Sequence, residues 1–145
     1  MELFELTDDV LLAGQIGPDT IPFIAEQGIR SIICNRFDGE VEGQPDFPSV
    51  ERAAAAQGIK AVYLPVLQPP QPISDEEGAA FGEVLASLPK PTLAYCRTGS
   101  RSVILWGLSE APRRPFKEIV IAGIGAGYDL TSWVPRFQQL HKPTP

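Results

Sequence analysis

The stretch TLAYCRTGSRS, residues 92–102, decides the fold of this chain. An apolar run follows Pro91, small and polar residues follow Cys96, and apolar positions return at helical spacing from Val103 onward. This pattern predicts a buried strand, a tight loop and a helix, in that order.

The loop that begins at Cys96 is predicted to bind an anion. Unpaired backbone N–H groups converge at the start of a helix, and the helix dipole adds positive potential there. These groups, with Arg97 and Arg101, should favour the thiolate form of Cys96 and make it a nucleophile. Gly99 can adopt a positive φ, and Arg101 can hold an oxyanion with two hydrogen bonds. The other loop residues assigned to substrate binding are Thr98, Ser100 and Ser102. The competing interpretation is that Cys96 is a small core residue.

Three segments of the chain resemble one known family. They are YCRTGSRS at 95–102, LLAGQI at 11–16 and NRFDGE at 35–40, and the resemblance extends from about Leu3 to Leu140. The family is the beta-lactamase-hydrolase-like family, in its phosphatase-like domain. The resemblance implies a fold similar to that of dual-specificity protein phosphatases. Some members are fused to sulfur-metabolising enzymes, so the resemblance implies either phosphatase or sulfur chemistry.

Loop length distinguishes these two chemistries. The phosphatase pattern has histidine before the cysteine and arginine six residues after it, whereas here Tyr95 precedes Cys96, Arg101 is five residues after it, and Ser102 is six after it. The shorter loop resembles that of rhodaneses, Cys-x-x-Gly-x-Arg, whose cysteine carries a persulfide sulfur between donor and acceptor. It should also form a tighter cradle, because each residue spans only about 3.3–3.6 Å.

A general acid is harder to find. Phosphate-ester cleavage needs a proton for the leaving group, and similar phosphatases supply it from an aspartate in a loop after an earlier strand. The corresponding segment here, residues 64–73, contains no carboxylate, and Asp75 is better explained as first-turn charge of the next helix. Asp38 is therefore the expected substitute. A thiolate that attacks a sulfane sulfur has a better leaving group and needs no such acid.

The first prediction is accordingly a sulfurtransferase. Cys96 would take sulfane sulfur from an anionic donor, either thiosulfate or a persulfide, and pass it to glutathione or a protein thiol. The alternative is a phosphatase that forms a phosphocysteine at Cys96, with Arg101 on the phosphoryl oxygens and Asp38 as acid. A third, non-catalytic possibility is an anion-binding or redox-sensing module in which Cys96 pairs with Cys34.

Two further groups could join the site. The polar loop at 36–48 leaves the end of a predicted strand, where ligands bind in α/β sheets, so Arg36 and Asp38 could reach the cradle. The alternative for this loop is an ordinary solvated connection. Cys34 ends the same strand and could resolve an oxidised or persulfidated Cys96, although a buried core thiol is the commoner fate of a free cysteine.

Strand and helix patterns alternate along the whole chain. We expect one α/β domain over residues 1–145, with three layers: a mostly parallel central sheet of about four or five strands and helices on both faces. The strand ending at Cys96 should be central, next to the strand ending at Cys34, and residues 141–145 should be frayed. Expected strands are 4–6, 10–13, 29–35, 59–66 and 92–95. Expected helices are 18–27, 49–57, 74–88, one that starts within 100–102 and continues over 103–109, 116–126 and 131–140.

Composition excludes several classes of function. The net charge of −6 and pI near 4.7 argue against nucleic acid or an anionic membrane as partner. Two distant cysteines and a single histidine, His141, provide neither a disulfide framework nor a metal site, and no cofactor is expected. The acidic start shows no signal-peptide pattern, and the longest apolar-rich run, 119–126, is too short to span a membrane, so a cytoplasmic protein is expected.

Overall fold

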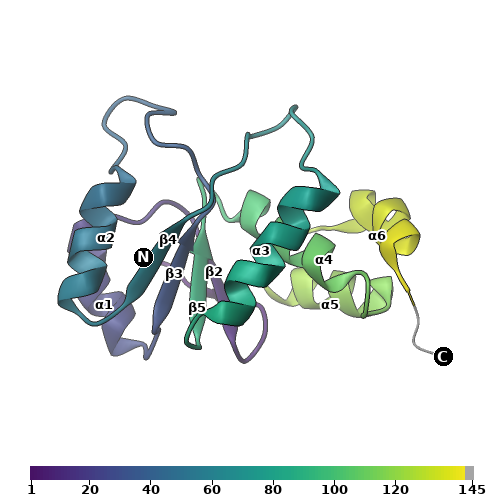
Figure 1. Ribbon diagram of the computed structural model, residues 1–145, viewed down its shortest axis with the longest axis horizontal. Helices are drawn as coiled ribbons and strands as arrows, with labels where there is room; N and C mark the ends of the chain where they lie inside the picture. The colour runs from purple at the N-terminus through teal and green to yellow at the C-terminus, as the bar shows by residue number, and fades with distance from the viewer. Residues whose placement is uncertain (143–145) are drawn as a thin grey trace.

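The computed structural model describes residues 1–142 and has one five-stranded sheet at its centre (Figure 1). The strand order is β1-β2-β5-β3-β4, with parallel pairing throughout except at β1, which pairs antiparallel with β2. A mostly parallel α/β sheet was expected, and this is confirmed. The strands are β1 (Phe4–Glu5), β2 (Val10–Ala13), β3 (Ser31–Cys34), β4 (Lys60–Tyr63) and β5 (Thr92–Tyr95).

Helices cover both faces of this sheet, so the molecule has the three expected layers (Figure 1). One face carries α1 and α2, and the other carries the helices from α3 to α6. The helical elements are η1 (Pro18–Thr20), α1 (Ile21–Glu26), α2 (Phe47–Ala56), α3 (Asp75–Ser87), α4 (Ser100–Glu110), α5 (Phe116–Gly125), η2 (Thr131–Trp133) and α6 (Val134–Leu140).

Strand β5 is the centre of the fold. It pairs with β2 on one side and β3 on the other, all four of its residues are buried, and Tyr95 lies opposite Cys34 in the β3 register. Both predictions about this strand, its central place and its neighbour, are confirmed. Because successive side chains of a strand point to opposite faces, Leu93 and Tyr95 join the core under α1 and α2, whereas Ala94 joins the core under α3 to α6.

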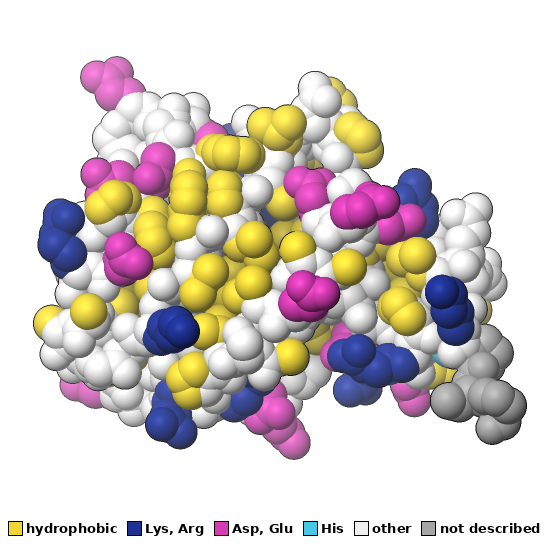
Figure 2. All heavy atoms as spheres, in the orientation of Figure 1, with side chains coloured by type: hydrophobic (Ala, Val, Ile, Leu, Met, Phe, Trp, Pro, Cys, Tyr) yellow, Lys and Arg dark blue, Asp and Glu magenta, His cyan; other side chains and the backbone are white. Residues whose placement is uncertain are grey.

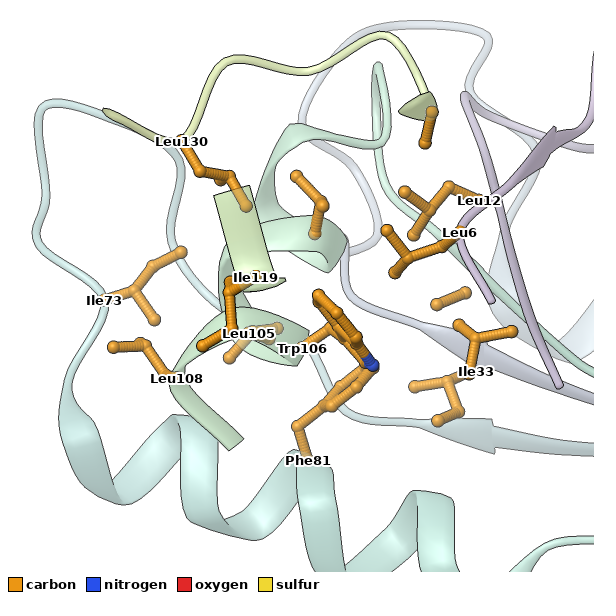
Figure 3. Packing of buried hydrophobic residues seen from close by; sticks show 14 of the residues in the cluster. Leu6, Leu12, Ile33, Ile73, Phe81, Leu105, Trp106, Leu108, Ile119 and Leu130 are labelled. Atoms are coloured by element: carbon orange, nitrogen blue, oxygen red, sulfur yellow. The ribbon is translucent and has the colours of Figure 1, made fainter. Parts of the chain in front are cut away.

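Trp106 of α4 and Phe81 of α3 fill the larger of the two cores. Figure 3 shows these rings together beside Leu12 and Ile33, which reach them from the sheet. Both rings are almost completely buried. Removing each large side chain from water contributes of order 2–3 kcal/mol to the free energy of folding. This packing holds α4, and therefore the loop that precedes it, against the carboxyl end of β5.

Local signals account for several helix boundaries. Ser74 and Glu77 form the capping box at the start of α3: Ser74 Oγ accepts from the Glu77 N–H at 3.1 Å, and Glu77 Oε1 accepts from the Ser74 N–H at 2.9 Å. Helix α4 begins at Ser100, within the expected start, and Gly99 is its N-cap in the left-handed conformation with φ of 93°.

Strand β4 is shorter than expected and ends at Tyr63 rather than Val66. The chain still follows β3 beyond that point, since the Leu64 and Val66 N–H groups donate to Cys34 O and Asn35 O. As the last strand of the sheet, β4 leaves one backbone edge unpaired. Apolar side chains gather between α2 and α3 on the face where this edge lies (Figure 2).

The start of the tail is more ordered than predicted. The His141 ring Nδ1 is 3.0 Å from Ala111 O, and the Lys142 N–H donates to Pro112 O at 2.8 Å. The expected fraying is therefore wrong for residues 141–142, and residues 143–145 lie outside the part of the chain that the structure describes.

Candidate active site

The Cys96 thiol lies at the start of the loop between β5 and α4, at the carboxyl edge of the central strand. The Gly99 N–H donates to Cys96 Sγ at 3.1 Å, and the residue is only 1% exposed. A backbone donor aimed at the sulfur stabilises negative charge there, as the loop pattern predicted. This loop therefore has the geometry of a nucleophile held at a helix start.

Tyr128 holds the loop from outside, and sequence reasoning missed it. Its hydroxyl donates to Thr98 O at 2.7 Å and lies too close to the position of a Cβ on Gly99 for any side chain to fit there. Burial, together with the nearby charge of Cys96, raises the pKa of Tyr128 and keeps the phenol neutral. Gly99 thus serves two purposes: positive φ and close approach.

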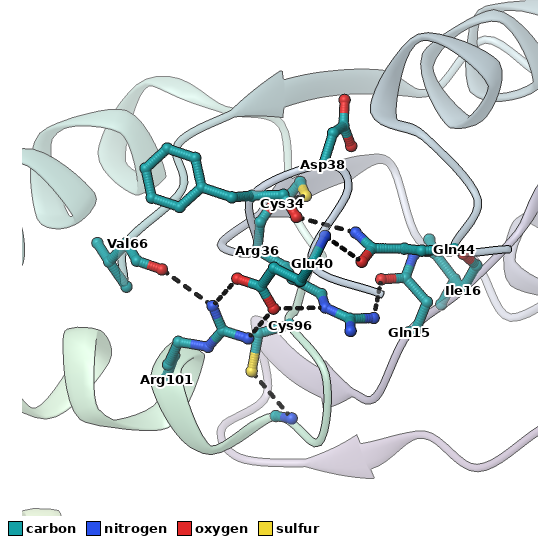
Figure 4. A network of polar contacts seen from close by, with 12 residues as sticks. Gln15, Ile16, Cys34, Arg36, Asp38, Glu40, Gln44, Val66, Cys96 and Arg101 are labelled. Carbon is teal, nitrogen blue, oxygen red and sulfur yellow. Dashed lines mark hydrogen bonds and ion pairs between the residues drawn. The ribbon is translucent and has the colours of Figure 1, made fainter. Parts of the chain in front are cut away.

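Arg101 faces Glu40 across the top of the loop (Figure 4). Arg101 Nη1 donates to Glu40 Oε2 at 2.7 Å and to Val66 O at 2.9 Å, and Nη2 donates to Glu40 Oε1 at 2.9 Å. Hydrogen bonds from Arg101 lower the pKa of Glu40 to about 2, against the effect of burial, and Arg36 adds to this lowering. Burial alone would lower the pKa of Arg101, but Glu40 and Cys96 more than offset it, so its pKa is raised.

Arg36 joins the same carboxylate from the β3 side. Its Nε donates to Glu40 Oε1 at 2.8 Å, and its Nη1 donates to Gln15 Oε1 at 3.0 Å. Gln15 is itself tied to the loop, because its backbone N–H donates to Arg97 O at 3.2 Å. The structure therefore brings Arg36 to the cradle as expected, through Glu40 and Gln15, neither of which was singled out from the sequence.

Asp38 does not face Cys96. Its Oδ1 accepts from the Phe47 N–H at 2.8 Å, which ties the loop to the start of α2, and Figure 4 shows the carboxylate pointing away from the sulfur. The expectation of Asp38 as the acid is therefore corrected. Glu40, two residues further along, is the carboxylate at the site, and its two arginine partners keep it ionised.

The remaining loop residues divide into inner and outer groups. Ser102 is fully buried and donates to Asn35 Oδ1 at 2.8 Å, while Asn35 Nδ2 donates to Leu64 O at 2.9 Å, so Ser102 joins α4 to two strand ends rather than facing a ligand. Ser102 was expected to bind the anion, and its hydrogen bond to Asn35 corrects this expectation. The side chains that are exposed on the outer surface of the loop are Arg97, Thr98 and Ser100.

Cys34 lies below the site and has partners of its own. Its thiol donates to Arg36 O at 3.2 Å, and it packs with Tyr95 in the core under α1 and α2. Burial raises the pKa of Cys34, and the charge of Cys96 makes the smallest contribution in the same direction. This is the environment of a buried core thiol, and a resolving role for Cys34 stays a prediction.

Elsewhere, a hollow of about 590 Å³ lies between α3 and the far end of α4. Residues such as Ala79, Gly82 and Leu108 line it, and no residue of the Cys96 loop does.

Within residues 1–142, no three His, Cys, Asp or Glu side chains gather as a metal ion would require. In the same part of the chain, no helix combines the length and the apolar character needed to cross a membrane.

Comparison with known proteins agrees with this geometry. Residues 2–113 match the family model of the phosphatase-like domain of beta-lactamase hydrolase-like protein. The chain belongs to this family. A beta-lactamase hydrolase-like protein of Agrobacterium fabrum is 32% identical over 141 residues, which cover 94% of this chain but 32% of that protein. The chain thus spans about a third of the length of that relative.

Solved structures place the family among cysteine phosphatase folds. A candidate phosphatase from Neisseria meningitidis Z2491 is 31% identical, with a TM-score of 0.85 over 97% of this chain and 99% of that one. The core catalytic domain of the PP-IP phosphatase SIW14 from S. cerevisiae, in complex with citrate, shares the fold at a TM-score of 0.66 and 13% identity, covering 97% of this chain and 85% of that one. The predicted family and the predicted phosphatase-like fold are both confirmed.

Proposed function

We propose that this domain is a cysteine-dependent phosphatase that hydrolyses phosphoric esters. The observation that carries the proposal is a thiol that accepts a backbone N–H at the start of α4, with two buried arginines above it. The family and the fold support it as well. This reverses the order of preference that loop length and the missing general acid favoured.

In this proposal the Cys96 thiolate attacks phosphorus, and the bond from phosphorus to the leaving oxygen breaks. The leaving oxygen departs with the bonding electron pair and takes a proton from solvent water, which a phenolate leaving group tolerates without an enzymic acid. A second water then cleaves the phosphocysteine and releases inorganic phosphate and the thiolate. Arg101 and the N–H groups of the loop bind the phosphoryl oxygens, where negative charge is concentrated in the transition state. Arg36 is a second cation for the same oxygens.

Sulfur transfer is retained as a second candidate because one observation favours it. Glu40, the carboxylate beside Cys96, is held ionised by Arg101 and Arg36, and Asp38 points away. Neither can protonate a departing alkoxide in this arrangement, whereas transfer of a sulfane sulfur to Cys96 requires no such proton. The acceptor in that case would be a thiol such as glutathione.

One experiment compares both activities in the wild-type protein and in two cysteine variants. Hydrolysis of an aryl phosphate and sulfur transfer from thiosulfate or glutathione persulfide are measured for wild type, Cys96→Ser and the matched control Cys34→Ser. We expect aryl phosphate hydrolysis to fall by at least about 100-fold in Cys96→Ser, as for loss of a nucleophile, and to persist in Cys34→Ser.

The other outcomes are equally informative. Cys96-dependent sulfur transfer without phosphate release would replace the phosphatase by the second candidate. No Cys96-dependent turnover of any of these substrates would favour a non-catalytic anion-binding or redox-sensing module.

A further inference from the structure

We infer that Glu40 is a built-in anion that occupies the two-arginine site and is displaced when the substrate oxyanion binds. The inference rests on the proposed function in one respect, the binding of an oxyanion beside Cys96. It adds a gating residue to the site and predicts that removal of the Glu40 charge opens it.

The first argument for this inference is the set of hydrogen bonds that Glu40 accepts. Its Oε1 accepts from both Arg36 Nε and Arg101 Nη2, and its Oε2 accepts from Arg101 Nη1. A phosphoryl group would use these same donors, because guanidinium groups bind carboxylate and phosphate oxygens with the same forked geometry. The side chains are 4%, 3% and 12% exposed for Arg36, Arg101 and Glu40, so solvent competes little for these contacts.

The charges at the site give the second argument. Two guanidinium groups face one carboxylate, and the Cys96 sulfur lies at the same edge of the sheet. A dianionic phosphoryl group added to this set would place its charge against that of Glu40, whereas displacement of Glu40 frees both guanidinium charges for the dianion. Binding and displacement are therefore coupled, and a doubly charged oxyanion suits the opened site.

The arginines have other acceptors that keep them in place once Glu40 leaves. Arg101 Nη1 also donates to Val66 O at 2.9 Å, and Arg36 Nη1 donates to Gln15 Oε1 at 3.0 Å. Glu40 is therefore not the only group that orients either guanidinium. A carboxylate that served only to position Arg101 would be its only acceptor, whereas here Arg101 keeps Val66 O as an acceptor when Glu40 leaves.

The segment that carries Glu40 lies between two glycines in the left-handed conformation. Gly39 and Gly43 flank it with φ of 77° and 81°, and nothing lies within 4 Å of the position of a Cβ on either. Within this loop, the Glu40 N–H donates to Gln44 Oε1 and Gln44 Nε2 donates to Phe37 O. The start of the loop is anchored at Asp38, whose N–H donates to Tyr63 Oη and whose Oδ1 accepts from the Phe47 N–H. The part between Gly39 and Gly43 is therefore what turns when the Glu40 side chain withdraws.

Binding of inorganic phosphate and of tungstate, measured by titration calorimetry, tests the inference. Glu40→Gln keeps the shape and removes the charge, and Glu42→Gln, an exposed carboxylate of the same loop, is the matched control. We expect Glu40→Gln to bind both anions at least about fivefold more tightly than wild type and Glu42→Gln to be unchanged. Equal or weaker binding by folded Glu40→Gln would overturn the inference, because a positioning residue predicts that result.

A second measurement covers the case in which Glu40→Gln does not fold. The structure of the wild-type protein with tungstate bound should show Glu40 withdrawn from Arg101 Nη1 and Nη2. Tungstate bound beside an intact Glu40–Arg101 contact would overturn the inference. Neither readout involves turnover, so inactivity with every substrate would count against the proposed function while tighter anion binding by Glu40→Gln would still support the displacement.

Discussion

Three charged side chains meet within hydrogen-bond distance above Cys96: Arg36, Glu40 and Arg101. Buried charges are tolerated only when each is paired, because removal of one partner leaves the others uncompensated. Here one carboxylate serves two guanidinium groups, so the resting site carries an excess positive charge that attracts an anion. The ion pairs of Glu40 with Arg36 and Arg101 therefore set the charge of the site, and on the inference above they also control whether an anion reaches the two arginines.

The pH dependence of stability follows from the same contact. Two arginines lower the pKa of Glu40 from 4.5 to about 2, so the folded protein keeps this carboxylate ionised where the unfolded chain would protonate it. The stabilisation is therefore complete above pH 4.5 and is lost as the pH falls through about 2. We expect the difference in unfolding free energy between wild type and Glu40→Gln to shrink as the pH falls over that range.

Urea unfolding of both proteins at several pH values across that interval measures the difference. Asp46 and Asp129 also have lowered pKa values, through hydrogen bonds from Ser49 and Thr131 respectively, but they are present in both proteins and cancel in the comparison. A difference that stays constant over the interval would show that Arg36 and Arg101 do not perturb Glu40 as the geometry implies.

At the scale of elements, the packing of β5 and α4 positions the loop between them at the carboxyl edge of the sheet. The strand delivers Cys96 to the middle of the sheet edge, Gly99 turns the chain with positive φ and donates its N–H to the sulfur, and α4 begins at the next residue. Packing of Trp106 and its neighbours keeps α4 from moving away from β5. The position of the thiol is thus a consequence of how two elements pack.

Helix α3 lies against α4 and depends on its own N-terminal cap. We expect Ser74→Ala to destabilise the protein by about 1 kcal/mol, because the Glu77 N–H loses its acceptor at the helix start. Urea denaturation measures the change. Ser87→Ala, at the other end of α3, is the control: its exposed hydroxyl bonds only to Val84 O, and we expect a change within about 0.5 kcal/mol. Equal effects of the two substitutions would contradict a specific role for the cap.

On the scale of the whole molecule, the sheet separates two cores that share its central strand. The residues of β5 contribute to both cores in alternation, so neither core can lose its packing without exposing the other side of the same strand. We expect unfolding as one cooperative unit. In urea, fluorescence of the buried Trp106 and far-ultraviolet circular dichroism should report one midpoint and one slope.

Trp133 is only partly buried, so Trp133→Phe leaves Trp106 as the probe of the core under α3 to α6. Separate midpoints for the fluorescence of this variant and for its circular dichroism would show that the two faces of the sheet unfold independently. That result would contradict the argument from the shared strand.

The central place of the strand before Cys96 could be predicted only from the alternation of strands and helices along the whole chain. The order of the elements and the loop that holds Cys96 and Arg101 follow from shorter stretches of sequence. These features depend on signals between neighbouring residues: hydrophobic period, glycine at a turn, and a capping box at Ser74. They need no knowledge of distant contacts, because each is a property of one short segment.

Only the tertiary structure decided which distant groups complete the site. Asp38 and Glu40 are two residues apart on one loop, and its conformation, set by contacts such as Phe47 N–H to Asp38, turns Glu40 toward the arginines. Likewise Ser102 meets Asn35, 67 residues away in sequence, and Tyr128 meets Thr98, 30 residues away. No local sequence pattern predicts these contacts, because they form only when the packing of strands and helices brings separate segments to one edge of the sheet.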